Sequence, residues 1–423
     1  MYPVKSIPEQ LTLNQVTCAM ELLNPAPLTA EQWTALRAYR LSRVQAELAS
    51  RNWPAIVLFD PHNVRYATGS RNMAVWTLHN HVRYTFVPAH GLPVLFEFGA
   101  GKWDVESAAL ESVGEIRRPR SWTHFYAGSD KTNRASAWAD ELAELVEEHC
   151  GGDQRLAFDH LDSTGLVELN KRHIQVLDGE PLMEHARLIK SNEEIVCLKH
   201  AIAVAQIGMQ NMRDALQPGM TENQLWSWLH QANIAHNGEW IETRLLSSGP
   251  RTNPWMQESS DRIIQAGELV AFDTDMIGPN GYCADISRTY LCGDQRADDE
   301  QRHLYQTAYE QIQHNISILR AGRTLHDVVS SEWAFPDEFL AYRYGLAHGV
   351  GLKDEFPFLV NAPDIDALGD PHMTLEAGMV LSVESYIGAV KGRQGVKLEE
   401  QVLITDTGCD VLSNFEFDAA LMQ

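Results

Sequence analysis

Apolar and polar residues change their spacing along the chain near residue 190. Residues 1–28 carry four prolines and little periodicity, so we expect an arm there. Thr29 and Gln32 then match a capping box that opens an amphipathic helix. The next elements expected are strands at Ala55–Phe59, Tyr84–Pro88, Pro93–Phe98 and Arg155–Asp159 and a helix at Ala135–Glu148. This mixture predicts an α/β N-terminal domain.

A second capping box, Ser191 with Glu194, opens the region that follows. Apolar residues from Ile195 onward recur at helical spacing. In the rest of the chain, the pattern predicts long helices that alternate with pairs of antiparallel strands. A single core seldom grows beyond about 250 residues, so 423 residues also fit two domains. We place them at 1–185 and 186–423.

Composition narrows the class of protein. With 44% apolar and 22% charged residues the chain is typical of a soluble globular protein. The first residues lack a signal peptide, and no long apolar run follows, so we expect a cytoplasmic protein without a membrane span. A net charge of −23 makes nucleic acid an unfavourable partner and mildly favours cationic or zwitterionic small molecules.

Acidic residues cluster in one predicted hairpin. In Phe272–Ile277, alternation on a continuous strand would place Asp273 and Asp275 on one face, where their charges repel unless a cation compensates them. A turn with Gly281 in the left-handed region would then set Asp285 opposite Asp275. An isolated pair of this kind is more often a solvated turn, so the pair needs further ligands to indicate a metal site.

Three residues farther along the chain are candidates for these further ligands. His348 lies in Ala-His-Gly-Val-Gly, and Glu384 and Glu399 interrupt strand-like apolar runs. Each alone is more often a packed histidine or an outward-facing carboxylate. Together the six residues offer five carboxylates and one imidazole without thiolates, a set that suits two divalent ions such as Fe, Mn, Co or Zn.

The order and contexts of these residues resemble the pita-bread metalloenzymes, which include Xaa-Pro aminopeptidases, prolidase and creatinase. The resemblance covers residues from about 187 to 423 and is carried by the following motifs: Arg187-Leu-Ile-Lys-Ser, Asp285-Ile-Ser-Arg-Thr, His348-Gly-Val-Gly and Gly395-Val-Lys-Leu-Glu399-Glu. It implies a catalytic α+β domain whose curved antiparallel sheet holds two metal ions. It also implies a homodimer in which the N-terminal α/β domain caps a partner's site.

Three departures from the family pattern bear on function. The stretch Asn253–Arg262 lacks the histidine that these hydrolases place there, and Asp273 is an additional acid. Where the family has a second histidine after His-Gly-x-Gly, this chain is one residue shorter and presents Asp354. The combination resembles the dimethylsulfoniopropionate lyase branch of the family.

That resemblance implies a di-iron centre and Asp354 as the catalytic base. It implies cleavage of a small zwitterionic substrate to dimethyl sulfide and acrylate by α-proton abstraction and β-elimination. Aromatic faces would hold the sulfonium, with Trp76 and Tyr344 preferred to Trp255, although each is individually more often a packing residue. Two alternatives stay open: a hydrolase of the Xaa-Pro peptidase or creatinase type, and a non-catalytic binding protein on the same scaffold.

Overall fold

The computed structural model describes residues 28–99 and 101–422, so most of the expected N-terminal arm lies outside the described residues. The chain divides into two compact units. The N-terminal unit comprises Ala30–Glu194 together with Gly351–Phe356, and the C-terminal unit comprises residues 195–350 and 357–422. The boundary expected after residue 185 falls inside a helix of the N-terminal unit, Glu180–Arg187.

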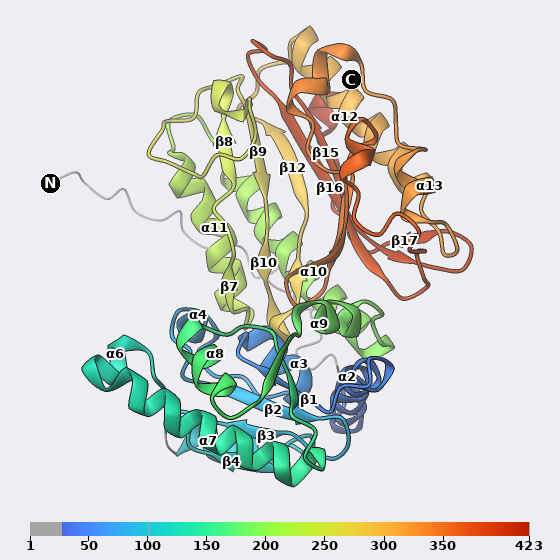
Figure 1. The fold of residues 1–423 in the computed structure, drawn as a ribbon. Helices are drawn as coiled ribbons and strands as arrows, with labels where there is room; N and C mark the ends of the chain where they lie inside the picture. Colours follow the sequence, from blue (N-terminus) through green and yellow to red (C-terminus); the bar gives the residue numbers. More distant parts are fainter. Residues whose placement is uncertain (1–27, 100, 423) are drawn as a thin grey trace, which may run out of the picture. The chain divides into compact units, whose positions relative to one another are not determined.

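A six-stranded mixed sheet forms the centre of the N-terminal unit, in the order β4-β3-β2-β1-β5-β6 (Figure 1). Its strands are β1 (Ala55–Leu58), β2 (Tyr84–Pro88), β3 (Val94–Phe96), β4 (Glu115–Arg117), β5 (Arg155–Phe158) and β6 (Gln175–Asp178). The four strands expected from the sequence are confirmed to within two residues. β4 and β6 were not expected, because they are short and their side chains are largely half-buried or exposed.

Helices surround this sheet. They are α2 (Ala30–Ser50), α3 (Pro61–Thr68), α4 (Ala74–His79), α5 (Lys102–Ala108), α6 (His124–Ala127), α7 (Lys131–Cys150), α8 (Ser163–Asn170) and α9 (Glu180–Arg187). The helix expected at 135–148 is confirmed as α7, whose Trp138 and Leu142 are fully buried in one core with Phe86 of β2 and Leu156 of β5. The apolar face of α7 therefore covers the sheet.

Antiparallel strands form the centre of the C-terminal unit. Its strands are β7 (Trp240–Ile241), β8 (Leu246–Ser248), β9 (Leu269–Asp273), β10 (Met276–Ile277), β11 (Cys283–Ala284), β12 (Ser287–Leu291), β13 (Ala347–Val350), β14 (Asp354–Leu359), β15 (Val380–Ile387), β16 (Val396–Ile404) and β17 (Cys409–Val411). The first three residues of β14 belong to the N-terminal unit. They pair in the orders β11-β10-β7, β12-β9-β8 and β14-β13-β15-β16-β17. Thr289 of β12 and Lys397 of β16 exchange two hydrogen bonds through the threonine hydroxyl, which holds these two strands side by side.

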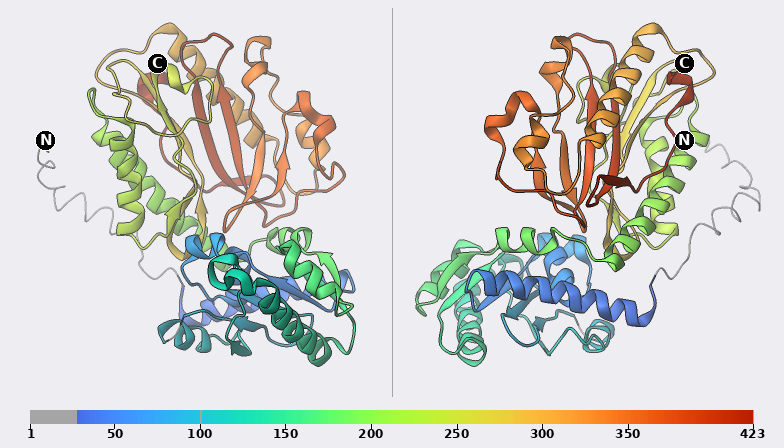
Figure 2. Two further views of the ribbon diagram at one scale, coloured as in Figure 1. Left: turned by 60° about the vertical axis from the view of Figure 1, so that its left-hand side comes forward. Right: turned by 90° about the vertical axis from the view of Figure 1, so that its right-hand side faces the viewer.

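The helices of the C-terminal unit are α10 (Asn192–Ala215), which begins in the N-terminal unit, α11 (Glu222–Ala235), α12 (Asp299–Ser317), α13 (Leu325–Val329) and α14 (Ala419–Met422), with short 3₁₀ turns η2 (Gly249–Thr252), η3 (Pro279–Gly281), η4 (Asp337–Tyr342) and η5 (Ala362–Ala367). Ser191 and Glu194 form the expected capping box, because each accepts a hydrogen bond from the other's backbone N–H. α12 packs along β15 and β16 (Figure 2). Across the described ranges, no helix combines the length and apolar character that a membrane span requires.

Candidate metal centre

The acidic hairpin is built from interrupted strands. β9 ends at Asp273 and β10 begins at Met276, and Asp275 between them has a φ of +35°. The expectation of one continuous alternating strand over 272–277 is therefore wrong. The cause is Thr274, whose hydroxyl donates to the Ala284 carbonyl (2.8 Å) and accepts from the Ile286 N–H (2.9 Å), so a side chain replaces part of the backbone ladder.

The hairpin nevertheless keeps the expected register. Met276 pairs with Ala284 and Asp273 with Ser287, which sets positions 275 and 285 opposite one another across the interruption. Gly281 adopts a φ of +73°, the left-handed turn conformation that the sequence predicts. The hairpin therefore brings its three aspartates together.

Six side chains converge from these strands and from β13, β15 and β16. They form three overlapping groups in which the potential ligand atoms lie within 4.8 Å of one another: Asp285, His348 and Glu399; Asp273, Glu384 and Glu399; and Asp273, Asp275 and Asp285. None of the six exposes more than 9% of its surface. All six residues singled out in the sequence thus lie in one buried cluster, and their role as metal ligands stays a prediction.

His348 lies on the side of the cluster next to Asp285. Its Nε2 is 3.3 Å from Asp285 Oδ2, 3.6 Å from Glu384 Oε1 and 3.8 Å from Glu399 Oε1. Its Nδ1 lies 3.0 Å from the Gly349 carbonyl oxygen, an arrangement that fixes the ring and leaves Nε2 directed at the carboxylates. Nε2 is therefore the atom that would ligate a metal.

Burial and mutual repulsion dominate the electrostatics. Burial and the Glu399 charge raise the pKa of Asp273 to about 6, and burial with the charges of Glu399 and Asp273 raises the pKa of Asp285. Burial alone would lower the pKa of His348, but contacts with Asp285 and the two glutamates outweigh burial and raise it. Without added positive charge, this cluster holds protons that ordinary carboxylates would release.

The donor set fits divalent cations. Among the described residues, buried oxygens of Asp273 (Oδ1), Asp285 (Oδ1) and Glu399 (Oε1) accept no hydrogen bond. Buried oxygens of this kind need a positive partner. Other oxygens are oriented by neighbours, since the Thr243 hydroxyl donates to Asp275 and the Ser287 hydroxyl donates to Glu399 Oε2 (2.8 Å).

Lys397 is a charged member of the cluster that the sequence interpretation missed. Its fully buried ammonium lies 3.1 Å from Asp273 Oδ2, 3.2 Å from Glu399 Oε2 and in contact with Glu384. The signal was present, because Lys397 lies two residues before Glu399 on β16 and so shares its face. Five ionised carboxylates and one ammonium sum to −4, which is the charge that two divalent ions would cancel.

Aromatic residues adjoin the cluster on one side. Trp255, Tyr386 and Tyr344 pack together, and the Trp255 ring centroid lies 5.8 Å from Lys397 Nζ. Burial and the charge of Glu384 raise the pKa of Tyr344, so the tyrosine lies within electrostatic reach of the acids. Trp76 belongs to the N-terminal unit, where it stacks on Phe98 with ring centroids 5.0 Å apart. The substrate-binding roles of Tyr344 and Trp76 stay predictions.

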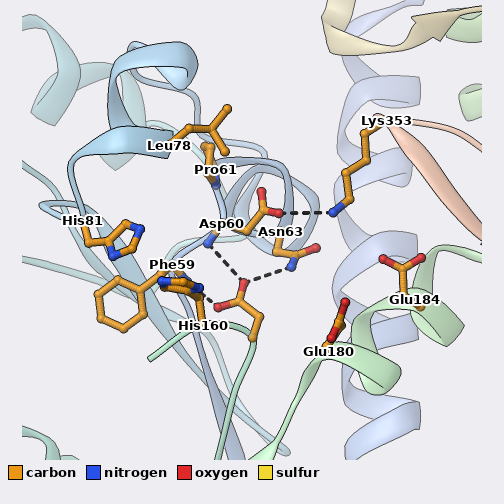
Figure 3. Close-up of a pocket in the computed structure, with 11 residues that line it drawn as sticks. Phe59, Asp60, Pro61, Asn63, Leu78, His81, His160, Glu180, Glu184 and Lys353 are labelled. Atoms are coloured by element: carbon orange, nitrogen blue, oxygen red, sulfur yellow. Dashed lines mark hydrogen bonds and ion pairs between the residues drawn. The ribbon is translucent and has the colours of Figure 1, made fainter. Parts of the chain in front are cut away.

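Asp354 opens β14 and exposes its side chain. It lies in Gly351–Phe356, the short segment that belongs to the N-terminal unit. A cavity of about 190 Å³ lies elsewhere in that unit, and Lys353 reaches Asp60 at its edge (Figure 3). None of the six clustered residues lines this cavity.

Comparison with known proteins relates both units to described families. Residues 196–406 match the model of metallopeptidase family M24, and residues 40–189 match the creatinase/prolidase N-terminal domain. Dimethylsulfoniopropionate lyase DddP of Roseovarius nubinhibens is 40% identical over 92% of this chain and 87% of its own length. Its namesake from Roseobacter denitrificans is 37% identical over 95% of this chain and 92% of its own length.

Solved structures give the same fold at lower identity. An Xaa-Pro dipeptidase from Bacillus anthracis superposes with a TM-score of 0.71 at 22% identity, covering 90% of this chain and 98% of its own. A prolidase from Pyrococcus horikoshii OT3 superposes with a TM-score of 0.69 at 20% identity, covering 89% of this chain and 99% of its own. The predicted fold class, an α/β N-terminal domain followed by a domain with a curved antiparallel sheet, is confirmed.

Proposed function

The chain belongs to the DddP family of dimethylsulfoniopropionate lyases within metallopeptidase family M24, and from this premise we propose that it cleaves dimethylsulfoniopropionate to dimethyl sulfide and acrylate. The observation that carries the proposal is the 40% identity to a lyase of that name over 92% of the chain. The chain is thus proposed to be a carbon–sulfur lyase.

The six buried residues are proposed to hold two divalent metal ions: Asp273, Asp275, Asp285, His348, Glu384 and Glu399. Oxygen donors with a single imidazole and no thiolate suit iron, our first choice, and also manganese, zinc or cobalt. When bound, the ions would supply Lewis acidity for the substrate carboxylate, which makes the neighbouring α-proton easier to remove.

Asp354 is proposed to take that proton. The electron pair of the broken Cα–H bond becomes the second bond of the alkene, and the pair of the breaking Cβ–S bond leaves on dimethyl sulfide. An ionised Asp354 and a neutral zwitterion thereby give a protonated Asp354, neutral dimethyl sulfide and the acrylate anion, so charge and atoms balance. Elimination needs no attacking water, in keeping with the absence of a histidine in Asn253–Arg262.

Aromatic faces are proposed to bind the sulfonium group. A cation is attracted to an aromatic ring within about 6 Å of its centroid. Tyr344 is favoured by its electrostatic coupling to Glu384, and Trp76 by the family pattern alone. We also propose that the protein forms a homodimer, because the family resemblance implies one.

A hydrolase of the Xaa-Pro type is the second candidate, because the solved structures with the same fold include dipeptidases and prolidases. One assay separates the two. The purified, metal-analysed protein is given dimethylsulfoniopropionate, Xaa-Pro dipeptides and creatine in parallel, and dimethyl sulfide, acrylate and released amino acids are quantified. We expect equimolar dimethyl sulfide and acrylate from the first substrate only. Dipeptide cleavage without dimethyl sulfide would overturn the lyase proposal.

A further inference from the structure

The segment Gly351–Phe356 lies in the N-terminal unit, although both of its flanks belong to the C-terminal unit. It begins three residues after His348 and contains Asp354, the proposed base. Residues 354–356 of the segment open strand β14, whose backbone pairs with β13, and residues 351–353 precede that strand. The side chains that anchor the segment add to this backbone pairing in fixing where Asp354 lies.

Glu355 is the central anchor of the segment. Its carboxylate lies 2.8 Å from Lys190 Nζ and 3.1 Å from Arg187 Nε, and the side-chain exposures are 1%, 3% and 1%. It also accepts the Leu352 N–H at 3.1 Å, which closes the segment on itself. Although burial raises the pKa of Glu355, Lys190 and Arg187 outweigh burial and lower it.

A second layer of contacts supports this anchor. Glu184 accepts the backbone N–H of Phe356 at 2.8 Å, and the guanidinium of Arg187 contacts both Glu184 and Asn63. On the other side of the segment, Lys353 Nζ lies 3.4 Å from Asp60 (Figure 3). Contacts on both sides of residue 354 thus connect the segment to α3 and α9.

The absence of a side chain at Gly351 leaves room for the Glu355 carboxylate. A Cβ at this position would lie 2.5 Å from Glu355 Oε2, closer than atoms can pack. The carboxylate therefore lies against the backbone of the segment's first residue. Any side chain at 351 would displace the anchor.

Buried ion pairs are weak sources of stability, because removing two charges from water offsets most of their attraction. A hydrogen-bonded ion pair nevertheless fixes the relative positions of the two side chains. Here two cations of one short stretch, Arg187 and Lys190, meet one carboxylate that adjoins Asp354 in sequence. Arg187 and Lys190, which belong to one of the motifs that carry the family resemblance, therefore have a structural role here.

We propose that Arg187, Lys190 and Glu184 are positioning residues that act through Glu355 and the Phe356 amide to fix the segment 351–356, and with it Asp354. This inference rests on the proposed lyase function for its kinetic consequence. The anchoring itself does not depend on that function.

The test compares Glu355→Gln with the wild type. Hydrogen–deuterium exchange of peptides covering 351–359 is measured together with kcat, KM and metal content for dimethylsulfoniopropionate cleavage. We expect the Leu352 and Phe356 amides to exchange at least about tenfold faster. We expect kcat to fall about ten- to a hundredfold with KM and metal content unchanged, because small misplacements of a reacting group have effects of this size.

Glu184→Ala is the second variant, because its side chain is partly exposed and its loss is compatible with folding even where Glu355→Gln is not. It should release the Phe356 amide and lower kcat. Its matched control is Glu180→Ala, which removes an exposed carboxylate one turn earlier on the same helix and should behave as wild type.

Two results would overturn the proposal. One is unchanged exchange of the segment in Glu184→Ala. The other is a loss of activity accompanied by a proportional loss of metal, which would indicate general disruption. If the wild type yields no dimethyl sulfide, the lyase function fails, and the exchange experiment still decides whether these residues anchor the segment.

Discussion

Glu384 and Glu399 occupy directly opposite positions on the neighbouring strands β15 and β16. Opposed like charges destabilise a strand pair, and at 4% and 0% exposure water does little to screen them. The pairing of these strands therefore depends on positive charge supplied nearby. Lys397 provides part of it, and the proposed metal ions would provide the rest.

Removing metal should destabilise the protein. A site occupied at a thousand times its dissociation constant contributes about 4 kcal/mol. At 2–4 °C per kcal/mol, we expect chelation to lower Tm by about 10 °C. Differential scanning calorimetry before and after chelation, and after restoring Fe²⁺ or Mn²⁺ anaerobically, checks this. A Tm that chelation leaves unchanged would contradict the proposed two-metal site.

Lys397→Met should affect the metal-free protein most. Removing one partner of a buried charge network costs about 3–5 kcal/mol, and bound cations would compensate part of that loss. We expect the drop in Tm to be larger after chelation than before it, and Lys397→Arg, which keeps the charge, to lose less. Equal drops in the loaded and chelated proteins would show that Lys397 acts only by packing.

Asp354→Ala should strongly reduce turnover while leaving the metal content near that of the wild type. A general base contributes about 10²–10⁴-fold to a rate, so a loss in kcat of this size is expected. Asp366→Ala, which removes an exposed aspartate elsewhere in the chain, serves as the control. Kinetics and elemental analysis check the prediction. Retained activity would remove the base assignment, and coincident loss of metal would make Asp354 a ligand.

Asp159 should make stability depend on pH. Burial raises its pKa from 3.8 to about 7, despite hydrogen bonds from Phe59, Asp60 and Asn63 that favour the ionised form. Between these values the folded state binds more protons than the unfolded state, so the free energy of unfolding falls as pH rises from about 4 to 7, by at most about 4 kcal/mol.

The check is urea denaturation of wild type and Asp159→Asn at several pH values. The variant cannot titrate at this position, so the wild type should lose more stability than the variant across that range. Parallel pH profiles for the two proteins would contradict the prediction.

The sequence predicted the long elements well because their signals are local. Tyr84–Pro88 is bounded as expected, and Ser191 caps α10 with Glu194, since alternation and capping depend only on neighbouring residues. It also identified the five clustered acids and the histidine, largely through a family resemblance. The clustering itself needed the β15–β16 register, which period-two alternation leaves undetermined.

Other features depended on contacts between distant segments. The interruption after Asp273 comes from the Thr274 hydroxyl bonding to Ala284 and Ile286, ten and twelve residues farther along. The segment Gly351–Phe356 belongs to the N-terminal unit because its side chains contact distant residues of that unit. One of these is Lys190, which lies 165 residues from its partner Glu355. Neither the spacing nor the composition of these stretches encodes such pairings.

The placement of Gly351–Phe356 also constrains how proteins of this architecture can recombine. A chimera that joins residues 195–423 of this chain to a relative's N-terminal half would inherit the whole acidic cluster, yet it would present Glu355 to foreign side chains. A chimera of two relatives should therefore fold correctly only where the residues at positions 187, 190 and 355 come from the same parent protein. Substitutions at these three positions should co-vary across descendants of a common ancestor.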